Sequence, residues 1–322
     1  MYSYADMHCD TLLRSLEDAP ERIYDGKGCM QGIRYMEKVR QMCQFFAVFF
    51  PPREENTKLP EDEEYFRILS SNLKTQVELH QDVIRMAGSY EEIQKNWAQG
   101  LASAVLTIED GRMVNGKMEK LEELHKEGVR AIALTWNYAN CFGFPNSREK
   151  EIMEKGLTEF GIEAIAEMNR LGILVDVSHL SDGGFYDVVK YSKKPFIASH
   201  SNSRSLTDHP RNLTDEMIRI LAENGGVAGL NLCPDFVNPK GTKPESKVEY
   251  LVEHVLHFLN VGGEECIGIG TDFDGIEGPL EIGNPMEMEI LFEALHQRGV
   301  TQRQLEKIAS GNVMRVIKES MY

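Results

Sequence analysis

The chain has 322 residues, of which 42% are hydrophobic and 27% charged, values that are ordinary for a folded globular protein. Its 35 basic and 51 acidic residues give a net charge of −16. This charge argues against a nucleic-acid or anionic-membrane partner, because both require a basic surface. No repeat or linker-like segment interrupts the chain, so we expect a single domain over residues 1–322.

The cysteines and the apolar runs indicate a cytoplasmic protein. None of the 6 cysteines belongs to a C-x-x-C pair, and a chain of this length needs no disulfide framework, so we expect reduced thiols. Structure is expected to begin near residue 4, which leaves no room for a signal peptide. No apolar run approaches the roughly 20 residues that a membrane helix needs. We therefore predict a cytoplasmic protein with no membrane contact.

The first predicted strand, residues 4–10, ends in His8-Cys9-Asp10. Alternate side chains of a strand share a face, so His8 and Asp10 point the same way and Cys9 points the other way. An imidazole beside a carboxylate is half of a site for a divalent metal ion. Alone, the same triplet is better explained as a polar strand end that meets solvent.

Further strands and helices alternate along the chain. Short apolar runs predict strands at 4–10, 42–50, 103–108, 129–135, 173–177, 196–199, 226–232 and 266–271. Apolar residues at helical spacing predict helices at 65–86, 118–127, 157–170, 214–223, 247–260, 286–298 and 301–318, after a charged loop at 53–64.

Eight alternating strands of this kind favour a closed (β/α)8 barrel, the TIM-type fold, with parallel strands and right-handed crossovers. The alternative, a doubly wound open sheet, predicts a glycine-rich phosphate turn after the first strand. Residues 8–11 (HCDT) do not resemble such a turn.

Polar residues follow five of these strands and would meet on one rim of the barrel, where barrel enzymes carry their chemistry. They are His8, Asp10, Glu109, His179, His200 and Asp272. Each has an ordinary structural explanation when taken alone, such as a hydrogen-bonded histidine or a carboxylate that caps a turn. Together they predict a metal site, and they suffice for two divalent ions that share a carboxylate. The histidines at 80, 125, 254, 257 and 296 lie in predicted helices and receive no role.

Several motifs resemble the membrane (renal) dipeptidase family, and the resemblance spans nearly the whole chain. The motifs are 8–10 (HCD), 107–111 (TIEDG), 156–172, 175–179 (VDVSH), 199–201 (SHS), 211–212 (RN) and 268–275 (GIGTDFDG). The resemblance implies a zinc-dependent dipeptidase on a (β/α)8 barrel of metallo-dependent hydrolase type, which agrees with the barrel expected from the strand pattern.

The resemblance also implies a role for each site residue. His8 and Asp10 would bind one zinc ion, His179 and His200 a second, and Glu109 would bridge the two. Asp272 would handle the proton of the attacking water. Arg211, eleven residues after His200, would bind the free carboxylate of a dipeptide, with Arg204 as its rival for this role.

The pattern breaks after the fourth strand. The family usually has a histidine after the Leu-Thr pair there, whereas this chain has Trp136. A tryptophan donates only through its ring N–H and cannot become cationic. Asn137 is a candidate replacement donor to the substrate, although it would equally suit a loop residue that bonds to the backbone. The substrate range and the turnover therefore stay open.

The expected function is hydrolysis of dipeptides, including those with a C-terminal D-residue, by a water shared between two zinc ions. One alternative is a related barrel hydrolase acting on a cyclic amide, lactone, phosphoester or aminopurine. Its usual His-x-His and its lysine after strand four are not found in this chain. The other alternative is a barrel that binds its metal ions but has little catalytic turnover. Trp136, in the place of the family's histidine, is the feature that supports this alternative. Family members are often dimers, so a homodimer is a candidate assembly, and β-lactam hydrolysis is a candidate side activity.

Overall fold

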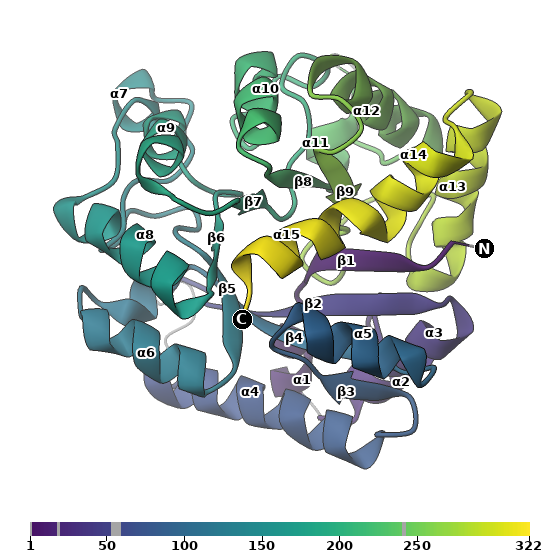
Figure 1. Ribbon diagram of the computed structural model, residues 1–322, viewed down its shortest axis with the longest axis horizontal. Coiled ribbons are helices and arrows are strands. Elements are labelled where there is room, and N and C mark those ends of the chain that lie inside the picture. The colour runs from purple at the N-terminus through teal and green to yellow at the C-terminus, as the bar shows by residue number, and fades with distance from the viewer. Residues whose placement is uncertain (1, 18–19, 53–58, 240–242) are drawn as a thin grey trace.

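The computed structural model describes residues 2–17, 20–52, 59–239 and 243–322. Parallel strands form one sheet that curls into a barrel (Figure 1). The strands are β1 (Tyr4–Cys9), β2 (Gln41–Phe49), β3 (Ile84–Met86), β4 (Ala102–Glu109), β5 (Val129–Ala133), β6 (Leu174–Asp176), β7 (Ile197–Ala198), β8 (Val227–Leu230) and β9 (Ile267–Ile269).

The order of the strands closes the barrel. The sheet runs β2-β1-β9-β8-β7-β6-β5-β4-β3, and β2 also pairs with β4, so every strand except β3 belongs to a closed ring. β3 pairs with the beginning of β4, at residues 102–104, while β5 pairs with β4 from Leu106 onward. The predicted (β/α)8 barrel is confirmed, with β3 as an additional short strand beside it.

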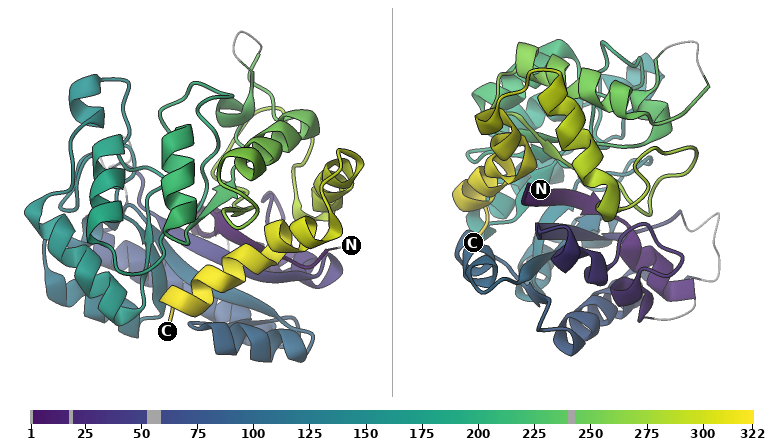
Figure 2. Two further views of the ribbon diagram at one scale, coloured as in Figure 1. Left: turned by 45° about the horizontal axis from the view of Figure 1, so that its top comes forward. Right: turned by 90° about the vertical axis from the view of Figure 1, so that its right-hand side faces the viewer.

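Helices surround the barrel (Figure 2). The α-helices are α1 (Thr11–Glu17), α2 (Arg22–Asp25), α3 (Ile33–Lys38), α4 (Asp62–Leu79), α5 (Tyr90–Ala98), α6 (Met118–Lys126), α7 (Lys150–Met153), α8 (Glu159–Leu171), α9 (Asp182–Tyr191), α10 (Asp215–Glu223), α11 (Pro234–Val237), α12 (Val248–Val261), α13 (Met288–Gln297), α14 (Gln302–Glu306) and α15 (Asn312–Ser320). Short 3₁₀ or π turns are η1 (Gly111–Val114), η2 (Pro285–Glu287) and η3 (Lys307–Gly311).

The apolar core has two parts. The larger part lies between the strands and the surrounding helices. The smaller part gathers barrel-strand residues such as Phe45, Val105 and Leu174 against residues of the C-terminal segment such as Val313 and Ile317. Helix α15 therefore closes one end of the barrel, as Figure 1 shows where it crosses the strands. The opposite end, where the strands finish, is free to carry side chains with a function.

Every predicted strand is present within two residues of its expected bounds, but the predicted helix at 65–86 is wrong over its last seven residues. Helix α4 ends at Leu79, and residues 84–86 form β3. Ile84 lies seven residues, about two helical turns, after Val77, so its position matches the apolar face of α4 by coincidence. The β-branched pair Val83 and Ile84 instead packs against β4.

Other expected boundaries also differ. Residues 53–58 of the predicted loop lie outside the described residues, and Asp62 already begins α4, whose acidic first turn favours a helix start. The predicted helix at 301–318 is α14 and α15 with the π turn η3 between them. Within the described ranges, no helix has both the length and the apolar character to cross a membrane.

Candidate metal centre

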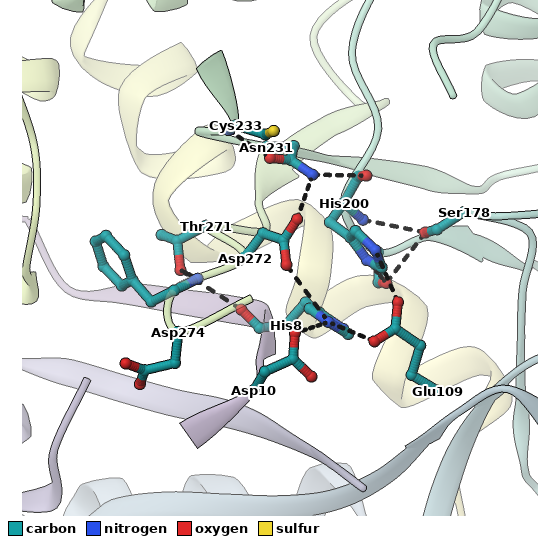
Figure 3. Close-up of polar contacts among 12 residues, drawn as sticks. His8, Asp10, Glu109, Ser178, His200, Asn231, Cys233, Thr271, Asp272 and Asp274 are labelled. Atoms are coloured by element: carbon teal, nitrogen blue, oxygen red, sulfur yellow. Dashed lines mark hydrogen bonds and ion pairs between the residues drawn. The ribbon is translucent and has the colours of Figure 1, made fainter. Parts of the chain in front are cut away.

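The predicted ligand residues meet where the barrel strands end (Figure 3). His8 lies near the end of β1 and Glu109 is the last residue of β4. His179 and His200 follow β6 and β7, and Asp272 follows β9. All of them are at most 7% exposed. The parallel direction of the strands thus places five segments that are distant in sequence at one site.

Local backbone contacts hold the ends of β1 and β9 together. The N–H and hydroxyl of Thr271 both donate to the buried carboxylate of Asp6, at 3.0 and 2.7 Å. The N–H of Asp272 donates to the carbonyl of His8 at 3.2 Å, and Asp272 adopts a positive φ of 63°. A Cβ on Gly275 would lie 2.1 Å from Asp10 Oδ2, so only glycine allows this close approach.

One group of candidate ligands surrounds His8. Its Nε2 lies 3.4 Å from Asp10 Oδ2, 3.6 Å from Glu109 Oε2 and 3.8 Å from Asp272 Oδ1. These separations are long for hydrogen bonds. They are close to the roughly 3.4 Å edge of a tetrahedron whose ligands lie about 2.1 Å from a zinc ion. His8 Nε2 and Asp10 Oδ1 are also buried with no hydrogen-bond partner among the described residues, which fits atoms that bind a cation.

A second group surrounds the other oxygen of Glu109. Glu109 Oε1 lies 2.7 Å from His179 Nε2 and 3.4 Å from His200 Nε2. The two imidazole nitrogens are 3.0 Å apart. The ligand atoms of His8, Asp10 and Glu109 all lie within 4.8 Å of one another, and so do those of Glu109, His179 and His200 and those of His8, His200 and Asp272. Glu109 therefore belongs to both groups, one oxygen to each, as a bridging carboxylate would.

The electrostatics of the site also call for a cation. Burial, together with the nearby Asp10 carboxylate, raises the pKa of Glu109 to about 8. Burial and Asp10 raise the pKa of Asp272 to about 6. Burial lowers the pKa of His179 and of His200 well below the usual value, so both imidazoles are neutral. Crowded carboxylates and neutral imidazoles are the donors that a divalent metal ion binds.

His8 behaves differently from the other two histidines. Burial alone would lower its pKa, but the Asp10 and Glu109 carboxylates outweigh burial and hold its pKa well above the usual range. Without a metal, a proton on His8 thus balances part of the carboxylate charge. A bound cation would take the place of that proton.

A cavity of about 710 Å³ opens in front of these residues, within the size range of small-molecule sites. Its walls include Glu109, His179, Asp272 and Arg211. Arg211 is only 4% exposed, its Nε has no hydrogen-bond partner among the described residues, and its other nitrogens make only long contacts. These contacts are to Ser201 Oγ at 3.5 Å and to the His200 carbonyl at 3.4 Å.

Arg204, the rival for binding a carboxylate, is already paired. Its two terminal nitrogens bind both oxygens of Asp182, at 2.7 and 2.8 Å. It also donates to the carbonyls of Asn212 and Pro210, on either side of Arg211. Arg204 therefore holds the loop in place, and of these two arginines it is Arg211 that lines the cavity.

Trp136 and Asn137 line the same cavity. The Trp136 ring packs against Phe49, with 5.0 Å between centroids, and lies 6.2 Å from the ring of His179. Asn137 Oδ1 lies 3.3 Å from His179 Nδ1. Asn137 thus contacts the ring nitrogen of His179 that points away from the ligand cluster, and it also borders the cavity.

Two polar residues of the site were not identified from the sequence. Asn231 donates to Asp272 Oδ2 at 2.8 Å and to the His200 carbonyl at 3.2 Å, so it fixes the direction of the Asp272 carboxylate (Figure 3). It directly follows β8, which ends at Leu230, but the strand predicted at 226–232 ran past it, so the rule used for the other strand ends did not find it. Asp176, within the 175–179 motif, is the other, and it bonds to both serines that precede the histidines.

Comparisons with known proteins agree with this geometry. The family model described as membrane dipeptidase (peptidase family M19) matches residues 2–321. A Klebsiella pneumoniae protein, described as an uncharacterised protein in the pqqA 5′ region, is 33% identical over 242 residues, 73% of this chain and 88% of that protein. An uncharacterised dipeptidase of Schizosaccharomyces pombe is 34% identical over 224 residues, 69% of this chain and 54% of its own length.

Two solved structures share the whole fold. A dipeptidase described as a metallopeptidase of family M19 superposes with a TM-score of 0.89 at 27% identity, covering 99% of this chain and 98% of its own. A metallopeptidase from Rhodobacter sphaeroides, bound to a phosphinate mimic of the dipeptide L-Ala-D-Ala, superposes with a TM-score of 0.87 at 25% identity over 99% of both chains. The chain therefore belongs to the membrane dipeptidase family, peptidase family M19, and is a metallo-dipeptidase that hydrolyses peptide bonds.

Proposed function

We propose that this protein hydrolyses free dipeptides with two zinc ions held at the carboxyl end of the barrel. The observation that carries the proposal is the buried guanidinium of Arg211, which opens into the same cavity as His179, Glu109 and Asp272. A buried cation without a carboxylate partner is costly, so its place beside a metal-binding cluster suggests that substrate supplies the missing anion.

We assign one ion to His8 and Asp10, the other to His179 and His200, and Glu109 to both. The two ligand groups that share Glu109 support this assignment. Bound there, the ions would polarise the scissile carbonyl and lower the pKa of a water that attacks it.

Asp272 is proposed to move the proton. Its Oδ1 faces His8 and its Oδ2 accepts a hydrogen bond from Asn231, so the carboxylate is aimed at the ligand cluster. Burial raises the pKa of this carboxyl above its usual value, which helps it to take a proton from water and pass it to the departing amine.

Arg211 is proposed to bind the substrate's terminal carboxylate. Its planar guanidinium can bind both oxygens of a carboxylate at once. An anchor at a fixed distance from the ligands would restrict the site to dipeptides. Asn137 is proposed as a hydrogen-bond donor to substrate, because it borders the cavity beside His179. The L-Ala-D-Ala mimic bound to the Rhodobacter sphaeroides relative supports acceptance of a C-terminal D-residue.

We further propose a cytoplasmic location. All 6 cysteines are free, and Cys9, Cys43 and Cys266 are buried. Free thiols throughout a chain of this size suit a reducing compartment.

The test combines metal analysis with a substrate panel. Purified protein is analysed for zinc per chain, then assayed with L,L- and L,D-dipeptides, dipeptide amides, lactones and phosphotriesters. We expect two ions per chain, hydrolysis of dipeptides with at most weak activity on the dipeptide amides and none on lactones or phosphotriesters, and loss of activity with a chelator. Metal-replete protein that hydrolyses no dipeptide would contradict the proposal and favour a barrel that has lost turnover.

A further inference from the structure

Asp176 is a buried carboxylate for which the proposed reaction gives no role. It is the last residue of β6 and only 4% exposed. Its Oδ1 accepts hydrogen bonds from the Ser178 N–H at 3.0 Å, the Ser178 hydroxyl at 2.6 Å and the Ser199 N–H at 2.9 Å. Its Oδ2 accepts the hydroxyl of Ser199. One carboxylate thus ties together the two serines that precede His179 and His200.

The Ser199 hydroxyl connects Asp176 to the ring of His200. Ser199 Oγ lies 2.7 Å from His200 Nδ1, and both residues are 1% exposed. A serine hydroxyl has a single hydrogen, and an ionised carboxylate only accepts. Because the Ser199 hydrogen points at Asp176, the hydrogen between Ser199 and the imidazole must come from Nδ1. His200 then carries its proton on Nδ1, and Nε2 keeps a free electron pair.

We propose that Asp176 is a positioning residue that selects, through Ser199, the tautomer in which His200 Nε2 can bind a metal ion. That Nε2 lies 3.4 Å from Glu109 Oε1 and 3.0 Å from His179 Nε2, inside the ligand cluster. Carboxylates commonly orient metal-binding histidines by accepting from the ring directly. Here a hydroxyl stands between the two groups. The inference rests on the proposed role of His200 as a ligand.

Ser178 provides an internal comparison. Its hydroxyl donates to the same Asp176 carboxylate, accepts the backbone N–H of His200 at 3.1 Å and lies 3.1 Å from Ser199 Oγ. Ser178 is as deeply buried as Ser199 but has no hydrogen bond to the imidazole ring. A role of Asp176 in packing alone would make the two serines equivalent, whereas control of the tautomer concerns Ser199.

The decisive variant is Asp176→Asn, which keeps the size of the side chain. Three donors converge on Oδ1, so the amide oxygen must occupy that position and the NH₂ group must face Ser199. The NH₂ group would then donate to Ser199 Oγ, and the Ser199 hydrogen would turn toward His200 Nδ1, which at 2.7 Å is closer than Ser178 Oγ at 3.1 Å. The ring proton would move to Nε2, where it faces the ligand cluster.

Two serine variants complete the set. Ser199→Ala removes the hydroxyl that connects Asp176 to the His200 ring and leaves the Asp176 carboxylate in place. Ser178→Ala removes a hydroxyl that also binds Asp176 but does not contact the ring. Zinc affinity is measured in competition with a chelator. We expect Asp176→Asn and Ser199→Ala to lower the affinity for one of the two zinc ions about 10- to 100-fold, which is the usual effect of removing the group that orients a metal-binding histidine. Ser178→Ala should stay within about threefold of the parent protein, because the ring keeps its acceptor.

A second measurement does not depend on metal. Nitrogen-15 spectra of the histidine rings in metal-free protein report which nitrogen carries the proton. We expect Nδ1–H on His200 in the parent protein and in Ser178→Ala, and Nε2–H in Asp176→Asn. Thermal unfolding of each metal-free variant checks that it is folded.

Parent-like zinc affinity in Asp176→Asn, with Nδ1–H retained, would overturn the inference. Equal weakening in all three variants would do the same, since it would indicate packing alone. A parent protein that binds no zinc would contradict the proposed function instead, and the nitrogen-15 spectra would still decide the tautomer.

Discussion

Replacing Arg211 by methionine should separate catalysis from stability. The guanidinium is 4% exposed, and burial lowers its pKa, so the folded protein holds this charge at a cost. Two hydrogen bonds to a substrate carboxylate, at about 1.5–3 kcal/mol each, amount to roughly 3–6 kcal/mol. Their loss should lower kcat/KM for dipeptides by about two to four powers of ten, mainly through KM. Metal-loaded Arg211→Met should meanwhile unfold at the same or a higher temperature than the parent.

The assay compares dipeptides with the matching dipeptide amides, which lack the terminal carboxylate. Arg211→Met should lose activity on the acids and retain most of its weak activity on the amides. Arg204→Met is the matched control, because Arg204 binds Asp182 within the same loop. It should lower the unfolding temperature without a preferential effect on the acids. Equal losses on acids and amides in Arg211→Met would refute a carboxylate-binding role.

Three further outcomes are expected. Trp136→His should raise kcat for dipeptides up to about tenfold, because an imidazole can become cationic and can donate a hydrogen bond to a developing oxyanion. The tenfold figure corresponds to the free energy of about one hydrogen bond. An unchanged or lower kcat would contradict this expectation. Removing metal with a chelator should lower the unfolding temperature, and zinc should restore it by an amount that grows with the logarithm of its concentration, as calorimetry can record. Burial lowers the pKa of His254 to about 4. Below pH 6.5 the unfolded chain therefore protonates this histidine, whereas the folded chain keeps it neutral until about pH 4. The free energy of unfolding should consequently fall by about 3 kcal/mol between pH 6.5 and 4. His254→Gln should remove that part of the slope in denaturant titrations at a series of pH values, and an unchanged slope would contradict the assignment.

Strand ends were the most predictable feature of this chain. An apolar run that stops at His8, Glu109 or His200 marks both a buried strand and a polar residue at its end. Because parallel strands in a barrel all finish at the same rim, a list of such residues is already a prediction of a site. Asn231 also follows its strand, β8, but the strand predicted at 226–232 was two residues too long at this end and concealed it.

Helical periodicity was less reliable than strand ends. Apolar residues recur at helical spacing throughout residues 65–86, yet the last three positions of this range, 84–86, form strand β3. A strand of three residues contributes too little sequence to compete with a neighbouring helical stripe. Its pairing with residues 102–104 of β4 supplies hydrogen bonds that local sequence does not encode.

The amino-acid sequence by itself determined the alternation of strands and helices, the polar residues at the strand ends and the family to which the chain belongs. These depend on local periodicity and on the identity of single residues. Only the tertiary structure decided that Glu109 lies between two ligand groups and that Asp176 bonds to the serine beside His200. It also decided that Arg204 is paired with Asp182, whereas Arg211 makes only long contacts among the described residues. These features are distances between residues far apart in the chain, and they exist only once the barrel has closed.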